Sequence, residues 1–79
     1  MKETIQHEKY GTITYSENAW TGKKEIVFNQ TPLLKTGKTT YIYKPDENTD
    51  ITVTVKGSFL TGVTLEVEGE NIKVISAPN

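Results

Sequence analysis

The sequence predicts an all-β protein, a small antiparallel β-sandwich or flattened barrel of about seven or eight short strands. Residues 51–56 alternate strictly, with Ile51, Val53 and Val55 on one face and threonine or lysine on the other, as in a half-buried strand. Short β-rich runs recur between turn signals, and helix signals are absent. The chain of 79 residues has the length of one domain, so we expect a single β domain over residues 1–79 with one modest core.

The first half of the chain contains a long irregular stretch between predicted strands. The strands expected there are residues 4–8, 12–16, 24–28 and 31–35. Residues 16–22 separate the second strand from the third and lack alternation, so we expect a loop that carries Trp20. Asn29 and Gln30 form the next turn, and Pro32, which has no backbone N–H to donate, indicates a sheet edge.

The second half of the chain predicts two strands and a closing hairpin. These elements are residues 39–43, residues 51–56 and a hairpin over residues 61–75. A two-residue turn at Gly69 and Glu70 matches apolar with apolar and acid with base across this hairpin. The predicted pairs are Val67 with Ile72, Glu66 with Lys73, and Leu65 with Val74. A turn at Glu68 and Gly69 would set Val67 against Glu70 and lose the apolar match.

Composition argues against several classes of function. The chain has nine basic residues, all of them lysine, against ten acidic residues, for a net charge of -1. Arginine, whose planar fork suits phosphates and base edges, is absent, so we expect no nucleic-acid partner. No cysteine is present to form a disulfide, a thiolate nucleophile or a zinc site. The first residues lack the apolar run of a secretory signal, and no stretch approaches the ~20 apolar residues that span a bilayer.

Three segments together resemble a bacterial family. They are residues 7–13 (HEKYGTI), 20–24 (WTGKK) and 55–65 (VKGSFLTGVTL). With them the chain resembles the N-terminal part of a group of small uncharacterised bacterial proteins that have a β-rich head followed by a hydrophobic, membrane-spanning tail. The resemblance covers nearly the whole chain and implies a β-rich head domain, but it assigns no activity. Because no apolar run precedes Asn79, it implies membrane attachment only through a tail beyond this residue.

Residues that could carry catalysis or bind a metal are few. His7 is the only histidine, and its neighbour Glu8 points to the opposite face of a strand, so we expect a solvated His7 without a catalytic role. Residues 46–50 match the opening of a calcium loop, but Ile51 replaces the required glycine and Gly57 replaces the closing carboxylate. One histidine without cysteine does not make an ordinary transition-metal site. We expect no catalytic residues, no metal site and no cofactor.

The aromatic residues give the candidate binding site. Tyr41 and Tyr43 share one face of a strand, where aromatic side chains more often fill a core than bind a ligand. Trp20 differs because it lies in a predicted loop close to Lys23 and Lys24, and functional contacts concentrate on loops that a rigid sheet positions. A large amphipathic ring with two flexible cations suits contact with a partner. We therefore predict that Trp20 is at least partly exposed and that these three residues form the binding site.

The leading functional hypothesis is a non-catalytic interaction or tethering module with an unidentified protein partner, the soluble head of a small bacterial membrane protein. The alternative is a small ligand-binding module, for carbohydrate as one example, and its sign would be a concave cluster of exposed aromatic residues. The second alternative is a minimal hydrolase centred on His7, which requires a pocket that holds this histidine with a carboxylate and a hydroxyl.

Overall fold

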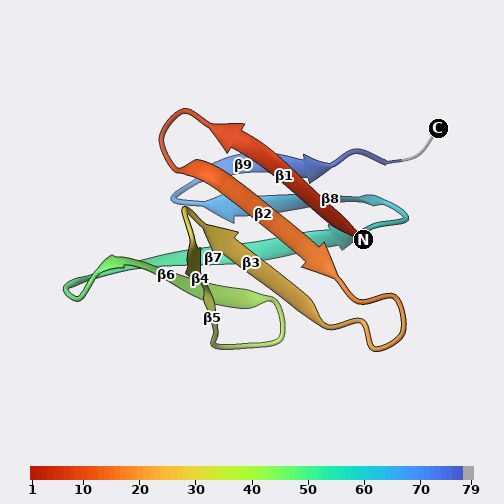
Figure 1. Cartoon of the computed structure of the whole chain (residues 1–79), viewed down its shortest axis with the longest axis horizontal. Helices are drawn as coiled ribbons and strands as arrows, with labels where there is room; N and C mark the ends of the chain where they lie inside the picture. The colour runs from red at the N-terminus through yellow and green to blue at the C-terminus, as the bar shows by residue number, and fades with distance from the viewer. Residues whose placement is uncertain (78–79) are drawn as a thin grey trace.

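Residues 1–77 of the chain form two antiparallel sheets packed face to face in this computed structural model (Figure 1). The strands are β1 (Lys2–His7), β2 (Gly11–Glu17), β3 (Lys24–Phe28), β4 (Thr31–Pro32), β5 (Leu34–Lys35), β6 (Thr40–Asp46), β7 (Thr49–Ser58), β8 (Gly62–Val67) and β9 (Glu70–Ile75). The first sheet has the order β1-β2-β3-β4 and the second the order β5-β6-β7-β8-β9. This small all-β sandwich confirms the predicted fold class. Among the described residues, no helix could span a membrane.

The described residues contain nine strands because the predicted strand at residues 31–35 is divided. Its first part, Thr31–Pro32, pairs with β3, whereas its second part, Leu34–Lys35, pairs with β6 of the other sheet. Leu33 lies between them and is buried, and its N–H donates to the Ile26 carbonyl at 2.8 Å. The chain therefore crosses from one sheet to the other at Leu33, and each of the two edge strands is only two residues long.

The core lies between the two sheets and is built from side chains at alternate strand positions. Val53, Val55 and Leu65 are buried, as predicted, and Ile51 packs against them half-buried. The complete set of buried apolar residues is Tyr10, Ile13, Tyr15, Ile26, Phe28, Leu33, Tyr41, Tyr43, Val53, Val55, Val63, Leu65, Val67, Ile72, Val74 and Ile75. Residues of both sheets contribute, so one continuous core holds the sandwich together.

The β8–β9 hairpin contradicts the predicted register. The observed pairs are Val67 with Glu70, Glu66 with Asn71, and Leu65 with Ile72. The turn residues are therefore Glu68 and Gly69, which both have positive φ, 50° and 82°. Positive φ at both central residues is the geometry of a type I′ turn, whose twist matches that of the flanking strands. The predicted register was chosen to match side chains across the hairpin. It was wrong because the geometry of the turn determines the register.

A bulge in the same hairpin adds a further apolar side chain to its buried face. Thr64 lies opposite Lys73, but Val63 lies opposite Ile75, so the ladder shifts by one residue around Val74. Both Val74 and Ile75 are buried, at 5% and 9% exposure, although consecutive strand residues normally face opposite sides. The extra residue allows the strand to add two adjacent side chains to the core.

Asn29 ties together two turns at one end of the first sheet. Its side-chain Oδ1 accepts the N–H of Thr12 at 2.9 Å, and its Nδ2 donates to the carbonyl of Tyr10 at 2.8 Å. These two bonds bracket Gly11, which has a φ of +77°, and a Cβ atom on Gly11 would overlap the Asn29 carboxamide. The β1–β2 turn and the β3–β4 turn are therefore locked to each other through the amide of one side chain.

Candidate functional site

Trp20 lies in a tight loop between β2 and β3, with 97% of its surface exposed. The Asn18 side chain holds this loop, because its Oδ1 accepts the N–H of Trp20 at 2.8 Å and that of Thr21 at 3.1 Å. The Gly22 N–H donates to the Asn18 carbonyl at 2.8 Å, and the Asn18 N–H donates to the Lys23 carbonyl at 2.9 Å. The backbone is thus fixed while the indole ring stands in solvent, which confirms the predicted exposure of Trp20.

A second turn with exposed apolar side chains lies at the same end of the sandwich (Figure 1). This turn connects β7 to β8 and carries Phe59 and Leu60, which are 38% and 67% exposed. Ser58 and Thr61 close it, because the Thr61 N–H donates to the Ser58 carbonyl at 3.1 Å and the Ser58 N–H donates to the Thr61 hydroxyl at 3.0 Å. The two apolar side chains therefore project from a turn whose backbone is internally bonded.

Met1 connects the two loops. Its exposed side chain lines a small hollow of about 60 Å³ with Glu17, Ala19 and Phe59. The Met1 amine donates to the Glu17 carbonyl at 3.0 Å, and the Glu17 N–H donates to the Met1 carbonyl at 2.8 Å, which fixes Met1 in place. We define the end face as Met1, Ala19, Trp20, Phe59 and Leu60. Met1, Ala19 and Phe59 share the hollow, and Trp20 and Leu60 are the exposed chain neighbours of Ala19 and Phe59, so apolar residues from three separate parts of the sequence lie at one end of the sandwich.

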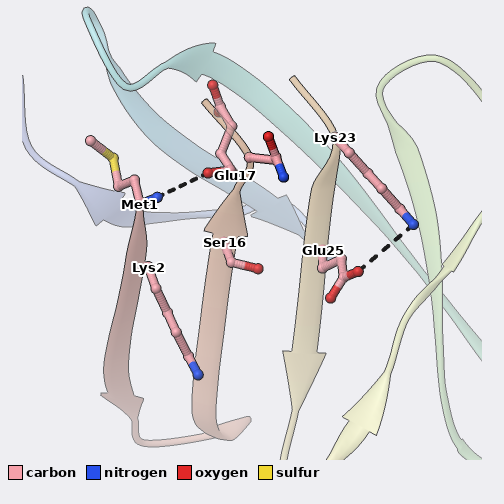
Figure 2. A pocket seen from close by; sticks show the side chains of 7 residues that line it. Met1, Lys2, Ser16, Glu17, Lys23 and Glu25 are labelled. Atoms are coloured by element: carbon pink, nitrogen blue, oxygen red, sulfur yellow. Dashed lines mark hydrogen bonds and ion pairs between the residues drawn. The ribbon is translucent and has the colours of Figure 1, made fainter. Parts of the chain in front are cut away.

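A polar hollow of about 360 Å³ adjoins the Trp20 loop at the ends of β1, β2 and β3 (Figure 2). The lining residues are Met1, Lys2, Ser16, Glu17, Asn18, Lys23 and Glu25. The amine of Lys23 lies 3.9 Å from the carboxylate of Glu25, so the cation and the anion largely balance each other. Such a lining offers both hydrogen-bond donors and acceptors, which suits a ligand rich in hydroxyl groups better than an ion.

Lys23 and Lys24 lie where the Trp20 loop leads into β3. Both residues line a groove between β3 and the edge of the second sheet, and Lys23 also reaches the polar hollow. The three predicted site residues therefore divide between two surfaces. Trp20 belongs to the end face, whereas the two lysines belong to the groove.

Among residues 1–77, two aromatic side chains are exposed, Trp20 and Phe59, and the other five are buried in the core. Tyr41 and Tyr43, which share one face of β6, point inward, and the Tyr43 ring packs against Phe28 with a centroid distance of 4.8 Å. This inward orientation agrees with the preference of aromatic residues at alternating strand positions. A row of exposed rings on a sheet face is not present among the described residues.

The expectation of a solvated His7 is wrong, because its side chain is only 15% exposed and is held at the rim of the sandwich. The Nδ1 atom accepts the backbone N–H groups of Lys9 at 3.1 Å and Tyr10 at 3.2 Å, and the ring stacks on Tyr10 with a centroid distance of 5.1 Å. The Nε2 atom lies 2.8 Å from Glu70 of the other sheet. Because Nδ1 accepts hydrogen bonds, the proton lies on Nε2 and is donated to Glu70. Neither nitrogen is available as a free base.

Glu68 forms a second polar contact at this rim, with Tyr10 and Lys9. The Tyr10 hydroxyl donates to Oε1 of Glu68, and the Lys9 amine lies 3.3 Å from the same oxygen. The bond from Tyr10, followed by that from Lys9, lowers the pKa of Glu68, and the bond to Glu68 raises the pKa of Lys9. Burial, followed by the bond to Glu68, raises the pKa of Tyr10. Each pKa moves away from neutrality, so this cluster favours a fixed contact over proton transfer.

The acidic turn at residues 46–50 uses its carboxylates internally. The Asp46 carboxylate accepts the N–H of Asn48 at 2.8 Å and the hydroxyl of Thr49 at 3.1 Å, and Asp50 pairs with Lys44. These are the local bonds that Asp commonly makes in turns. Within residues 1–77 there is no group of three His, Cys, Asp or Glu side chains that could hold a metal ion.

No protein-family model, curated protein or solved structure matches this chain. The features that bear on function are therefore the end face, the polar hollow and the groove. The sequence interpretation assigned Trp20 a role but missed Met1, Phe59 and Leu60. The signal for the last two was present, because Phe59 and Leu60 are adjacent apolar residues in a short segment between Gly57 and Gly62, where a turn exposes them.

Proposed function

We propose that this domain is a non-catalytic interaction module that contacts a protein partner through its end face. The exposure of Trp20 is the observation that carries the proposal. Tryptophan is the residue type most enriched among side chains that dominate binding energy, and large exposed apolar side chains gathered in one place are characteristic of interaction surfaces. Phe59 and Leu60 add exposed apolar side chains at the same end of the sandwich, where Phe59 shares a hollow with Ala19.

The rigidity of the two loops supports this role. The Asn18 side chain fixes the backbone of the Trp20 loop, and Ser58 and Thr61 close the turn of Phe59. A partner therefore meets apolar side chains whose backbone is already ordered, which reduces the conformational entropy lost on binding.

The tethering part of the proposal rests on the resemblance to bacterial proteins with a β-rich head and a membrane-spanning tail. In this proposal the domain is the soluble head, and the tail holds it at a membrane where its partner is found. The sequence of the complete gene tests this part directly. An apolar run of ~20 residues after Asn79 would support it, and a stop codon at that point would contradict it.

A ligand-binding module remains the second candidate because the polar hollow adjoins the Trp20 loop (Figure 2). Its mixed lining suits a sugar, for which the indole ring would be a stacking surface. The concave cluster of exposed aromatic residues that this function calls for is not present among residues 1–77. The hydrolase alternative gains no support from His7, since both of its ring nitrogens are bonded within the protein.

Photo-crosslinking in cells that make the protein tests the end face as a contact surface. A photoreactive residue replaces Leu60 in one variant and Gln30 in the matched control, because Gln30 is exposed at the opposite end of β3. We expect a discrete adduct from position 60, lost when Trp20→Ala is added to the same chain. Equal adducts from both positions, or an adduct that Trp20→Ala leaves unchanged, would contradict the proposal.

Nuclear magnetic resonance of isotope-labelled protein tests the second candidate. Soluble oligosaccharides would shift the amide signals of Ser16 and Asn18, which line the polar hollow, in a saturable manner. Saturable shifts at these positions, together with a negative crosslinking result, would favour the ligand-binding module over the interaction module.

A further inference from the structure

An open groove separates the two sheets where β3 and β4 face β5 and β6. Its volume is about 540 Å³. The groove exists because β4 pairs only with Val27 and Phe28, so no strand of the described part of the chain covers the outer side of the first half of β3. The chain leaves the first sheet at Leu33 and does not return to cover this edge.

The backbone of Lys24 presents hydrogen-bonding groups at this uncovered edge. The Lys23 carbonyl faces β2, because it accepts the N–H of Asn18. Successive residues of an antiparallel strand direct their N–H and C=O groups to opposite sides, so those of Lys24 and Ile26 face away from β2. The Ile26 carbonyl accordingly accepts the N–H of Leu33 at 2.8 Å. No strand within residues 1–77 pairs with Lys24 on that side, so its N–H and C=O are available to an incoming strand.

The floor of the groove is apolar and contains one polar group without a partner. Ile26, Leu33 and Tyr41 line it, each with less than a tenth of its surface exposed. The Tyr41 hydroxyl is buried and has no hydrogen-bond partner among the described residues. A buried hydroxyl normally has a partner, so the hydrogen-bonding capacity of this lining residue is unused.

The mouth of the groove is positively charged. Lys23, Lys24 and Lys35 line it, and Glu25 is the one acidic lining residue. Lys23 lies 3.9 Å from Glu25, whereas Lys24 and Lys35 form no ion pair within residues 1–77. This surplus of positive charge stands out in a protein whose net charge is -1. It favours an acidic occupant, because complementary charges steer association and determine partner choice.

We propose that this groove binds an extended acidic segment of a protein partner, which adds to the free edge of β3 as a further strand. The segment pairs with the backbone of Lys24, places alternate apolar side chains on the floor, and directs its carboxylates toward the three lysines. This is the mode of strand addition by which extended peptides are recognised at sheet edges. The inference goes beyond the proposed function, because the groove is a different surface from the end face and can bind when the end face does not.

A short peptide of alternating Glu and Val, blocked at both termini, is the probe. Titrated into isotope-labelled protein, it is expected to shift the amide signals of Lys24, Ile26 and Leu33 in a saturable manner, with weaker binding at high salt. The double variant Lys24→Glu/Lys35→Glu should bind at least about tenfold more weakly. Lys38→Glu is the matched control, because Lys38 is exposed in the β5–β6 turn and should leave binding unchanged.

Two further peptides and one further variant distinguish strand addition from simple charge attraction. The same acidic peptide with N-methylated backbone amides cannot pair as a strand, and a Lys-Val peptide of equal length has the wrong charge, so neither should bind. Trp20→Ala should bind the acidic peptide as the parent does, which separates this site from the end face. Failure of the acidic peptide to saturate, equal binding of the N-methylated or the Lys-Val peptide, or shifts confined to the Trp20 loop would each overturn the proposal. In that case the edge lysines serve only to keep β3 from pairing with other chains.

Discussion

The carboxylate of Glu70 lies 2.8 Å from Nε2 of His7, a residue of the other sheet. Glu70 begins β9 and His7 ends β1, so this contact joins the two sheets at the edge where these strands meet (Figure 1). Glu70 occupies this place because it pairs with Val67, whose side chain is buried, and residues paired across an antiparallel ladder share a face. The hairpin register thus places a carboxylate at the margin of the core, where the opposite sheet supplies its partner.

Glu70→Gln should lower the free energy of unfolding by about 1 kcal/mol or less, because half of the Glu70 side chain is exposed and glutamine keeps an oxygen that can accept the hydrogen bond from His7. Urea unfolding of Glu70→Gln, His7→Gln and the double variant measures the coupling between the two residues. Glu8→Gln is the control, since Glu8 is exposed on the neighbouring turn. A double variant whose loss equals the sum of the two single losses would show that the contact contributes nothing.

Leu65→Ala should lower the free energy of unfolding by about 2 to 5 kcal/mol, because Leu65 is fully buried and its truncation leaves a cavity between the sheets. This loss could remove most of the stability of a domain of this size. Leu34→Ala is the matched control, since Leu34 is also a leucine but is 56% exposed on β5. Chemical denaturation should show little change for Leu34→Ala, and equal losses for the two variants would refute the assignment of faces.

Trp20→Ala should leave the free energy of unfolding within about 0.5 kcal/mol of the parent, because the ring makes almost no contact with the rest of the protein. The wavelength of fluorescence emission of the parent, whose only tryptophan is Trp20, should match that of indole in water. Phe28→Ala provides the contrast, since this fully buried ring should cost about 3 to 5 kcal/mol. Blue-shifted emission in the parent, with unfolding of Trp20→Ala, would show that Trp20 closes the core and would remove it from the end face.

Tyr41→Phe should leave the free energy of unfolding unchanged or raise it by about 1 kcal/mol, because the hydroxyl that it removes is buried without a partner. Tyr15→Phe should instead lower this free energy by about 1 to 3 kcal/mol, since the Tyr15 hydroxyl donates to Glu17 at 2.6 Å. Thermal or urea unfolding of the two variants side by side makes the comparison. A larger loss for Tyr41→Phe than for Tyr15→Phe would mean that the Tyr41 hydroxyl has a partner in solution.

Stability should fall at alkaline pH, because burial raises the pKa of Tyr41, and burial followed by the hydrogen bond to Glu17 raises the pKa of Tyr15. The unfolded chain releases these protons near pH 10.0, whereas the folded protein holds them to higher pH. The contribution of these two tyrosines to the free energy of unfolding is therefore complete below pH 10.0. It is lost as the pH rises through the pKa values of the folded protein. Urea unfolding at successive pH values should show this loss, and Tyr15→Phe/Tyr41→Phe should reduce its slope. An equal slope in parent and double variant would assign the pH dependence to other groups.

The sequence predicted the elements of this fold better than their registers. The alternation around Val53 and Val55 identifies a half-buried strand, because only one face of such a strand meets the core. The β8–β9 register depends instead on backbone dihedral angles at Glu68 and Gly69 and on the bulge at Val74, neither of which changes the pattern of apolar letters. Matched side-chain pairs contribute only a few tenths of a kcal/mol to about 1 kcal/mol each, which is too little to override the geometry of a turn.

The candidate sites were predicted in part. A tryptophan in an irregular stretch between strands is exposed when the local bonds close the loop, as Asn18 closes the loop of Trp20. Met1 and Phe59 lie far apart in sequence, and only the ends of β1 and β7 bring them to one hollow. The groove depends on the shortness of β4, which follows from the crossing of the chain at Leu33. The arrangement of the strands in the two sheets brings such distant residues together, and the pattern of apolar residues along one sequence does not predict that arrangement.

The contact between Gly11 and the Asn29 carboxamide has a consequence for the ancestry of this chain. No side chain fits at position 11 while Asn29 bonds to the backbone on both sides of it, and the backbone at position 11 has a positive φ that few residues adopt. The two positions are therefore expected to vary together in any lineage that keeps these turns. A glycine and an asparagine at this separation, each in a tight turn after an alternating strand, form a signature by which remote relatives can be recognised after the rest of the surface has diverged.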